Sequence, residues 1–236
     1  MTSPRCASAD SGTTPFEANS EEESLWIFGY GSLVWRPAFE HLESHPAYIK
    51  GFARRFWQGS MDHRGLPERP GRVVTLLPNE SVQEIERADF EPHPCWGTAY
   101  RILRSDPDRV LAGLDHRERG GYDRLELDLY FPEAADADAS VSNQEEARPT
   151  PGLVYIASPA NRNYLGFAPV DAIAQQIAGA RGPSGPNPEY VFELAQGLRK
   201  MGAVDPHVFS IEAALVEHSS LTGESPEQKQ KQRPGA

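Results

Sequence analysis

The stretch Leu25-Trp26-Ile27-Phe28-Gly29-Tyr30-Gly31-Ser32-Leu33 is the most informative part of this chain. Its first four residues are apolar and predict a buried β-strand. The two glycines around Tyr30 let the backbone turn sharply and approach a ligand closely. Successive N–H groups in such a turn converge into a nest that binds a carboxylate or a phosphate. The same residues also suit an ordinary tight turn, so both interpretations stand at this point.

A dinucleotide-binding fingerprint is the nearest rival interpretation of this stretch. That fingerprint needs a third glycine at the start of a helix. Here Val34 occupies that position, and Trp35-Arg36-Pro37 follows without a helical pattern. We therefore exclude a nicotinamide or flavin site.

The composition excludes several classes of partner. The 236 residues include 34 acidic and 23 basic side chains, for a net charge of −11, which argues against nucleic acid and anionic membranes. No apolar run is long enough to span a bilayer, and the first residues do not resemble a secretory signal, so we expect a cytoplasmic protein. Cys6 and Cys95 do not suggest a disulfide framework, and His63 and His93 lack the spacing of metal ligands.

One domain with a tail at each end is the predicted organisation. Residues 1–24 and 219–236 are polar, lack periodicity, and are predicted to be disordered. The domain covers residues 25–218 and contains an acidic loop insert at about residues 132–151.

Strand patterns come first in the domain and helical patterns follow. Strands are predicted over residues 25–30, 47–52, 54–58 (with a break near Ala53), 72–77, 95–103, 122–131 and 153–156. Helices are predicted over residues 170–180, 187–202 and 206–218, the second with a cap at Asn187. This order predicts an α+β domain with a closed or strongly curved sheet flanked by helices.

Glu118 is the candidate general base. A capped helix is predicted to start at Ser105 and to stop at Gly120-Gly121, and Glu118 falls in line with its apolar stripe. Burial and the negative end of the helix dipole would both raise the pKa of this carboxyl group. Such a group suits proton transfer near neutral pH. Alternatively, the helix frays earlier and Glu118 joins the solvated run of residues 115–119.

Three other residues are weaker candidates. Arg72 opens a strand and either receives a carboxylate or pairs on the surface. Tyr122 follows the glycine pair and either lines the site or packs in the core. Ser32 has no histidine and aspartate motif that would make it a nucleophile.

Several blocks, in this order along the chain, resemble the ChaC family of glutathione-specific γ-glutamylcyclotransferases. The blocks are residues 27–35, 54–59, 62–65, 70–77, 95–100, 117–122, 164–166, 182–185 and 189–190. They cover nearly all of residues 25–218, so the resemblance rests on the ordered set rather than on one motif.

The resemblance implies a γ-glutamylcyclotransferase-like fold, a small mixed β-barrel flanked by helices, in a cytosolic enzyme without metal or cofactor. It implies conversion of glutathione to 5-oxoproline and cysteinylglycine, with Glu118 as the catalytic residue and Arg119 in place of the family's lysine. The substrate loop would be Tyr30, Gly31, Ser32 and Leu33, with Arg72 and Tyr122 as further contacts. We expect a monomer whose partner is a small-molecule substrate.

Two alternatives remain open from the sequence. The same scaffold could cyclise other γ-glutamyl amines or dipeptides. A non-catalytic carboxylate-binding protein would use the turn at Gly31 and leave Glu118 solvated.

Overall fold

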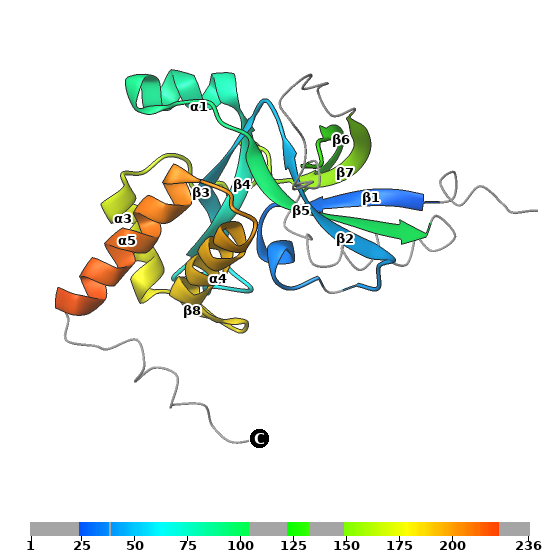
Figure 1. Cartoon of the computed structure of the whole chain (residues 1–236). Coiled ribbons are helices and arrows are strands. Elements are labelled where there is room, and N and C mark those ends of the chain that lie inside the picture. The colour runs from blue at the N-terminus through cyan, green and yellow to red at the C-terminus, as the bar shows by residue number, and fades with distance from the viewer. Residues whose placement is uncertain (1–23, 38, 104–121, 133–148, 222–236) are drawn as a thin grey trace, which may run out of the picture.

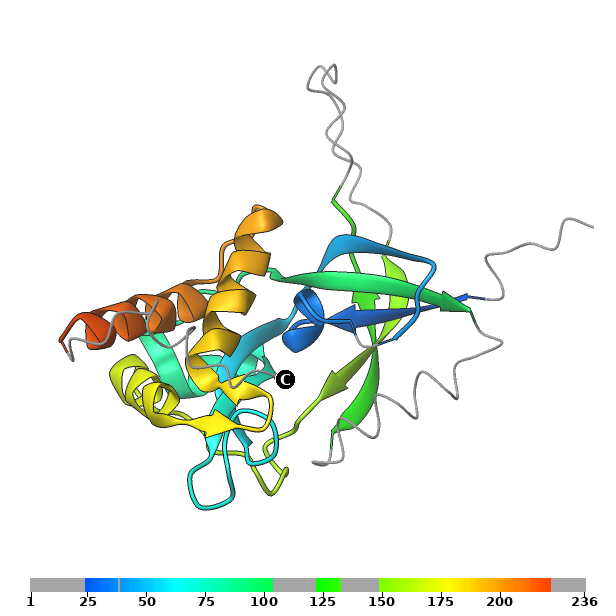
Figure 2. The ribbon, with the colours of Figure 1, turned by 90° about the horizontal axis from the view of Figure 1, so that it is seen from below.

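The computed structural model describes residues 24–37, 39–103, 122–132 and 149–221. Strands and helices separate into two halves, as the α+β prediction requires. A five-stranded sheet forms one half, and a two-stranded hairpin with three helices forms the other (Figure 1). The view from below shows the same two halves (Figure 2).

The five-stranded sheet is mixed and strongly curved. Its order is β2 (Glu43–Ile49), β5 (Cys95–Leu103), β1 (Ser24–Gly29), β7 (Thr150–Ile156) and β6 (Asp123–Leu129). Only β1 and β7 are parallel among these neighbours. The edge strands come together at one bridge, where Tyr48 and Tyr130 exchange two backbone hydrogen bonds of 2.9 Å. The described residues continue this pairing no further, so a closed barrel, as expected from the sequence, is not shown.

The second half is built on a hairpin of β3 (Phe52–Ser60) and β4 (Gly71–Pro78). β3 is buried on both faces from Ala53 onward, because the sheet lies on one side of it and helices lie on the other. The helices are α3 (Val170–Gly179), α4 (Asn187–Lys200) and α5 (Pro206–Leu221). Short elements complete the description: η1 (Ser32–Val34), α1 (Asn79–Glu86), η2 (Arg87–Asp89), β8 (Arg181–Gly182) and β9 (Gly185–Pro186).

Several predicted boundaries need correction. The break between the second and third strands falls at Gly51, whose φ of +82° suits glycine, and not at Ala53. α1 follows Pro78 and was not predicted. Helix α5 continues to Leu221, so the first residues assigned to the C-terminal tail are helical. The predicted helix from Ser105, most of the acidic insert and most of both tails lie outside the described residues.

Arg54 lies at the centre of the molecule and is fully buried. Its Nη2 donates to the carbonyl oxygen of Trp96 and to Cys95 Sγ at 3.4 Å, and its Nη1 lies 3.4 Å from Asp205 Oδ2. Burial by itself lowers the pKa of Arg54, but Cys95 and Asp205 raise it overall, so the group stays charged. Asp205 Oδ1 also accepts the N–H of Val208 in the first turn of α5. One cation therefore joins β3, β5 and the start of α5.

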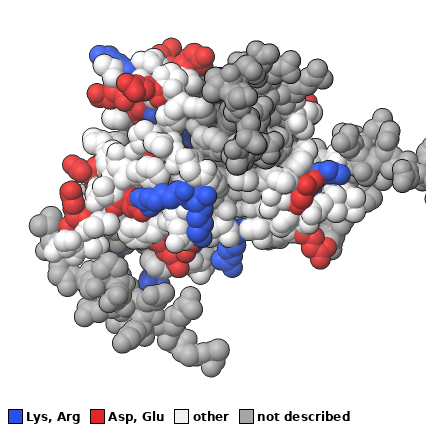
Figure 3. All heavy atoms as spheres, in the orientation of Figure 1, with Lys and Arg blue, Asp and Glu red and all other residues white. Residues whose placement is uncertain are grey.

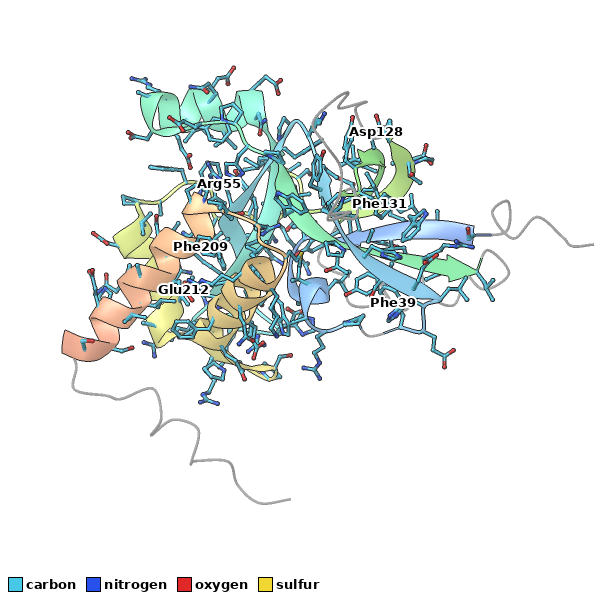
Figure 4. The ribbon with its side chains drawn as sticks, viewed as in Figure 1. Phe39, Arg55, Asp128, Phe131, Phe209 and Glu212 are labelled. Atoms are coloured by element: carbon cyan, nitrogen blue, oxygen red, sulfur yellow. The ribbon has the colours of Figure 1, made fainter. Side chains whose placement is uncertain are left out.

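Two further ion pairs attach helices to their neighbours. Arg55 of β3 donates to both carboxylate oxygens of Glu86, at 2.8 and 2.7 Å, and so holds α1 against the hairpin (Figure 4). Arg199 of α4 pairs with Glu212 of α5, and its guanidinium lies 4.7 Å from the ring centre of Phe209. Figure 4 shows Phe209 and Glu212 together on α5.

Acidic side chains gather on the surface over α1, at the upper left of Figure 3. Across the residues that the structure describes, no helix has both the length and the apolar character needed to cross a bilayer.

Because Asp205 is the counterion of the buried Arg54, its removal is predicted to destabilise the folded protein strongly. The Asp205→Ala variant leaves a buried cation without its counterion and should lower the free energy of unfolding by about 3–5 kcal/mol. Loss of the cap on α5 adds about 1 kcal/mol. Urea denaturation measures the change. Asp171→Ala, in the exposed first turn of α3, is the matched control and should cost well under about 1 kcal/mol. Equal effects of the two variants would contradict a special role for the buried pair.

His207 predicts a pH-dependent stability. Its side chain is half-buried, and its Nε2 accepts the N–H of Phe56 at 3.1 Å. Burial lowers its pKa well below 6.5, and Arg55, Arg54, Arg72 and His93 add to that effect. Below about pH 6.5 the unfolded chain binds a proton that the folded chain does not. The free energy of unfolding should therefore fall by up to about 1.4 kcal/mol per pH unit between pH 6.5 and the lower folded pKa.

Urea denaturation of wild type and His207→Gln at pH 7 and pH 5 measures this contribution. Glutamine can still accept the Phe56 N–H but does not titrate. The difference between the two proteins should therefore shrink as pH falls. A difference that is constant over this range would show that His207 is not the titrating group.

Candidate functional site

A cavity of about 370 Å³ lies where the two halves of the molecule meet. The sheet contributes the end of β1, η1 and Tyr155 of β7, and Tyr122 lies beside them. The other half contributes the end of β3, the loop that follows it, two residues of β4, Ser184 and Tyr190 of α4. This volume suits a small molecule.

The turn after β1 forms one wall and is tightly packed. A Cβ atom at Gly29 would lie 2.4 Å from Leu33 Cβ, and one at Gly31 would lie 2.7 Å from Tyr190 Oη and 3.1 Å from Val74 Cγ2. Glycine is therefore required at both positions by close approach. The Val34 N–H donates to the Gly31 carbonyl at 2.9 Å and holds the turn in shape.

Two tyrosine hydroxyls brace this turn. Tyr30 is 6% exposed, and its hydroxyl donates to the Tyr155 carbonyl at 2.7 Å. The Tyr100 hydroxyl donates to the Leu33 carbonyl at 2.5 Å, and burial raises the pKa of Tyr100. The Tyr30 proton is thus already used within the protein. Tyr30, Gly31, Ser32 and Leu33, the residues predicted to form a substrate loop, all line the cavity.

Tyr122 also lines the cavity and packs beside the small cluster of Ile27, Ile102 and Tyr155. Glu118 lies outside the described residues. It precedes the cavity residue Tyr122 by four positions in the sequence.

Arg72, predicted as a further substrate contact, does not line the cavity. Its Nε donates to Gln176 Oε1 at 2.6 Å, and its Nη1 donates to the carbonyls of Phe56 and Gly166 at 2.9 and 3.3 Å. Burial lowers the pKa of this guanidinium. Its backbone N–H and carbonyl both bond the side chain of Asn187, at 2.6 and 2.8 Å. Arg72 therefore attaches α3 and α4 to the hairpin.

Asn187 has a different role from the predicted helix cap. Its side chain makes no capping bond at the start of α4 and is used on the backbone of Arg72 instead. The bond fixes the first turn of α4, which carries Glu189 and the cavity residue Tyr190.

Arg64 is a buried cation that lines the cavity, to which the exposed Arg36 also contributes, and the sequence analysis assigned Arg64 no role. Its side chain is 8% exposed, and its Nη1 donates to Glu189 Oε2 at 2.9 Å and to the Pro186 carbonyl at 3.0 Å. Among the residues that the structure describes, its Nε and Nη2 have no hydrogen-bond acceptor. The one signal in the sequence was its place in the block of residues 62–65.

Polar groups at the rim lie near Arg64. His63 Nδ1 is 3.3 Å from Ser184 Oγ, and the His63 side chain is half exposed, next to Asp62. Within the described ranges, no three His, Cys, Asp or Glu side chains lie close enough together to hold a metal ion. The cavity is thus lined by the glycine turn after β1 on one wall and by a buried cation on the other. A glycine turn of this kind and a guanidinium are both groups that bind carboxylates in proteins.

A family model described as ChaC-like protein matches residues 25–218 of the chain. A relative from Danio rerio, called glutathione-specific gamma-glutamylcyclotransferase 1, is 44% identical over 86% of this chain and 94% of its own length. The Homo sapiens protein of the same name is 40% identical over 84% of this chain and 81% of its own length.

A solved structure has the same fold. It is the crystal structure of a yeast γ-glutamylcyclotransferase described as specific to glutathione, with a TM-score of 0.73 and 30% sequence identity. The match covers 83% of this chain and 97% of that one.

The close approach of Gly31 to Tyr190 predicts a specific rescue. Gly31→Ala should lower the free energy of unfolding by about 1–3 kcal/mol, because the added methyl group overlaps the Tyr190 hydroxyl. Adding Tyr190→Phe removes that oxygen, and the next ring atom, Cζ, lies 3.9 Å away. The double variant should therefore be more stable than the sum of the two single effects predicts, as measured by urea denaturation. Simple additivity would contradict the contact.

Proposed function

This chain belongs to the ChaC family, and we propose that it degrades glutathione by converting it to 5-oxoproline and cysteinylglycine. The observation that carries the proposal is the cavity, which pairs the backbone turn at Gly31 with the buried cation Arg64. Relatives named glutathione-specific γ-glutamylcyclotransferase support the choice of substrate. Glutathione has two carboxylates, one at each end.

The proposed reaction is an intramolecular aminoacyl transfer. Glu118 accepts a proton from the α-ammonium group of the glutamyl residue. The resulting amine attacks the γ-carbonyl carbon and forms the new C–N bond of a five-membered ring. The bond between that carbon and the cysteinyl nitrogen then breaks as Glu118 returns its proton to the departing nitrogen. The ring nitrogen also gives up its second proton, so that it ends as an amide N–H and cysteinylglycine leaves with a protonated amine. Atoms balance without water, and the scheme uses no metal, cofactor or enzyme nucleophile.

The cavity contributes orientation to this scheme. N–H groups of the turn formed by Gly31, Ser32 and Leu33 would hold the glutamyl α-carboxylate, while Tyr122 and the ring of Tyr30 border the same region. Ring closure gains strongly when the amine is held against its own carbonyl. The braced shape of the turn supports this role.

We place this activity in the cytoplasm and assign it to a monomer. The buried free thiol of Cys95 suits a reducing compartment, which is also where reduced glutathione is maintained. The net charge of −11 does not favour nucleic acid or anionic membranes as partners.

Incubation with glutathione, followed by mass spectrometry for 5-oxoproline, tests the proposal. The wild-type chain should form the product, and Glu118→Gln should lower the rate by about a hundredfold or more. The variant should still bind glutathione, because the amide keeps the shape of the side chain. Glu84→Gln, on the exposed face of α1, is the matched control and should keep full activity.

Each negative result of these assays would contradict a different part of the proposal. Full turnover by Glu118→Gln would remove Glu118 from catalysis. Product from γ-glutamyl-alanine but not from glutathione would favour an enzyme for other γ-glutamyl compounds. Binding without product from either compound would favour a carboxylate-binding protein.

A further inference from the structure

A nearly buried guanidinium must be held by partners, because a charge removed from water is costly without them. Arg64 meets this requirement through one nitrogen only, because Nη1 donates to both Glu189 Oε2 and the Pro186 carbonyl. Within the described ranges, the hydrogen bonds of this guanidinium all come from Nη1, and the opposite edge, formed by Nε and Nη2, bonds no acceptor. That edge presents two parallel N–H groups, the arrangement that binds a carboxylate through both of its oxygens.

The junction between β9 and α4 is shaped to let Glu189 reach Arg64. Gly185 has φ +108°, and a Cβ atom there would lie 2.8 Å from Glu189 Oε2 and 3.2 Å from Arg64 Nη1. The bond of Asn187 to the backbone of Arg72 fixes the first turn of α4 against the hairpin. Glu189 stands in that turn, where the helix dipole favours a negative charge.

Glu189 acts through Arg64. Its side chain is 46% exposed, and it does not line the cavity. A carboxylate placed against a carboxylate ligand would repel it, so direct contact with the anionic end of the substrate is excluded on physical grounds. What Glu189 supplies is a fixed position for Nη1, which in turn orients the edge formed by Nε and Nη2.

We propose that Glu189 is a positioning residue that holds Arg64 ready for the glycine carboxylate of glutathione. This inference rests on the proposed function and deepens it. The glutamyl carboxylate goes to the backbone turn at Gly31, and Arg64 lies on the wall contributed by the other half of the molecule. The pair therefore selects γ-glutamyl substrates that have a second carboxylate.

Calorimetric binding in the Glu118→Gln background, which holds the substrate unreacted, tests the proposal. Two ligands are compared: glutathione and its glycinamide analogue, which lacks the second carboxylate. Adding Glu189→Ala should weaken the binding of glutathione about tenfold, as loss of an oriented charge-assisted hydrogen bond implies. Binding of the analogue should change less than about twofold, because it makes no bond that depends on Arg64.

Two variants separate positioning from folding and from simple charge. Glu193→Ala, one turn further along α4 and without a partner among the described residues, is the matched control and should leave both affinities unchanged. Glu189→Gln keeps an acceptor for Nη1 and should weaken glutathione binding less than Glu189→Ala does. If Glu189 acted only by its charge, removing it would tighten the binding of an anion, which is the opposite result.

Steady-state kinetics with Glu118 intact give an independent measure. Glu189→Ala should raise KM for glutathione about tenfold and leave kcat within about twofold, because the loss is in binding. Equal weakening of both ligands, an effect on kcat alone, or tighter binding by Glu189→Ala would overturn the proposal. Absence of 5-oxoproline from the wild-type protein would defeat the proposed function instead, while the binding ratios would still decide the role of Glu189.

Discussion

The structure depends on one buried cation. Arg54 has no access to water, so it must find its partners inside the protein. It donates to the carbonyl oxygen of Trp96 in β5 and forms an ion pair with the carboxylate of Asp205, the residue before α5. These partners lie far apart in the sequence, and they can reach Arg54 only when the sheet, the hairpin and helix α5 meet at strand β3. The requirement for pairing therefore specifies how the two halves are joined, whereas apolar burial alone would accept many arrangements.

The position of the cavity follows from the way in which Arg54 and its partners join the two halves of the molecule. β3 carries Arg54 near its start and leads, at its other end, to the loop that carries Arg64. Phe56 lies between them and contacts both the His207 ring, at 6.1 Å between ring centres, and the Tyr190 ring, at 5.9 Å. The strand that anchors the core therefore also places one wall of the site. The turn at Gly31 closes from the sheet side and leaves a space of ligand size between two rigid parts.

Sequence patterns identified the parts of the fold whose signals are local. The strand and glycine turn at residues 25–33, the helices and the α+β class follow from periodicity and small residues, which act within a few positions. Arginine roles were not predictable in this way. Arg54, Arg64 and Arg72 all lie on or beside strands, and only the tertiary neighbours decide which one joins the halves, which one faces the cavity and which one holds the helices. The sequence predicted Asn187 as a helix cap, but its side chain bonds the backbone of Arg72 instead.

The two anion-binding walls differ in a way that bears on selectivity. Backbone N–H groups in a turn bind any carboxylate that fits, and their position is set by the turn itself. An arginine side chain that is free to move loses rotamer entropy when it binds a ligand, and this loss weakens the affinity. A guanidinium that is already held in place therefore discriminates better between ligands. The hydrogen bond from Arg64 Nη1 to Glu189 restricts the Arg64 side chain before a ligand binds, so less rotamer entropy is lost on binding. In the proposed binding mode, the turn after β1 recognises the glutamyl end of the substrate, and the junction of β9 and α4 discriminates among the compounds attached to it.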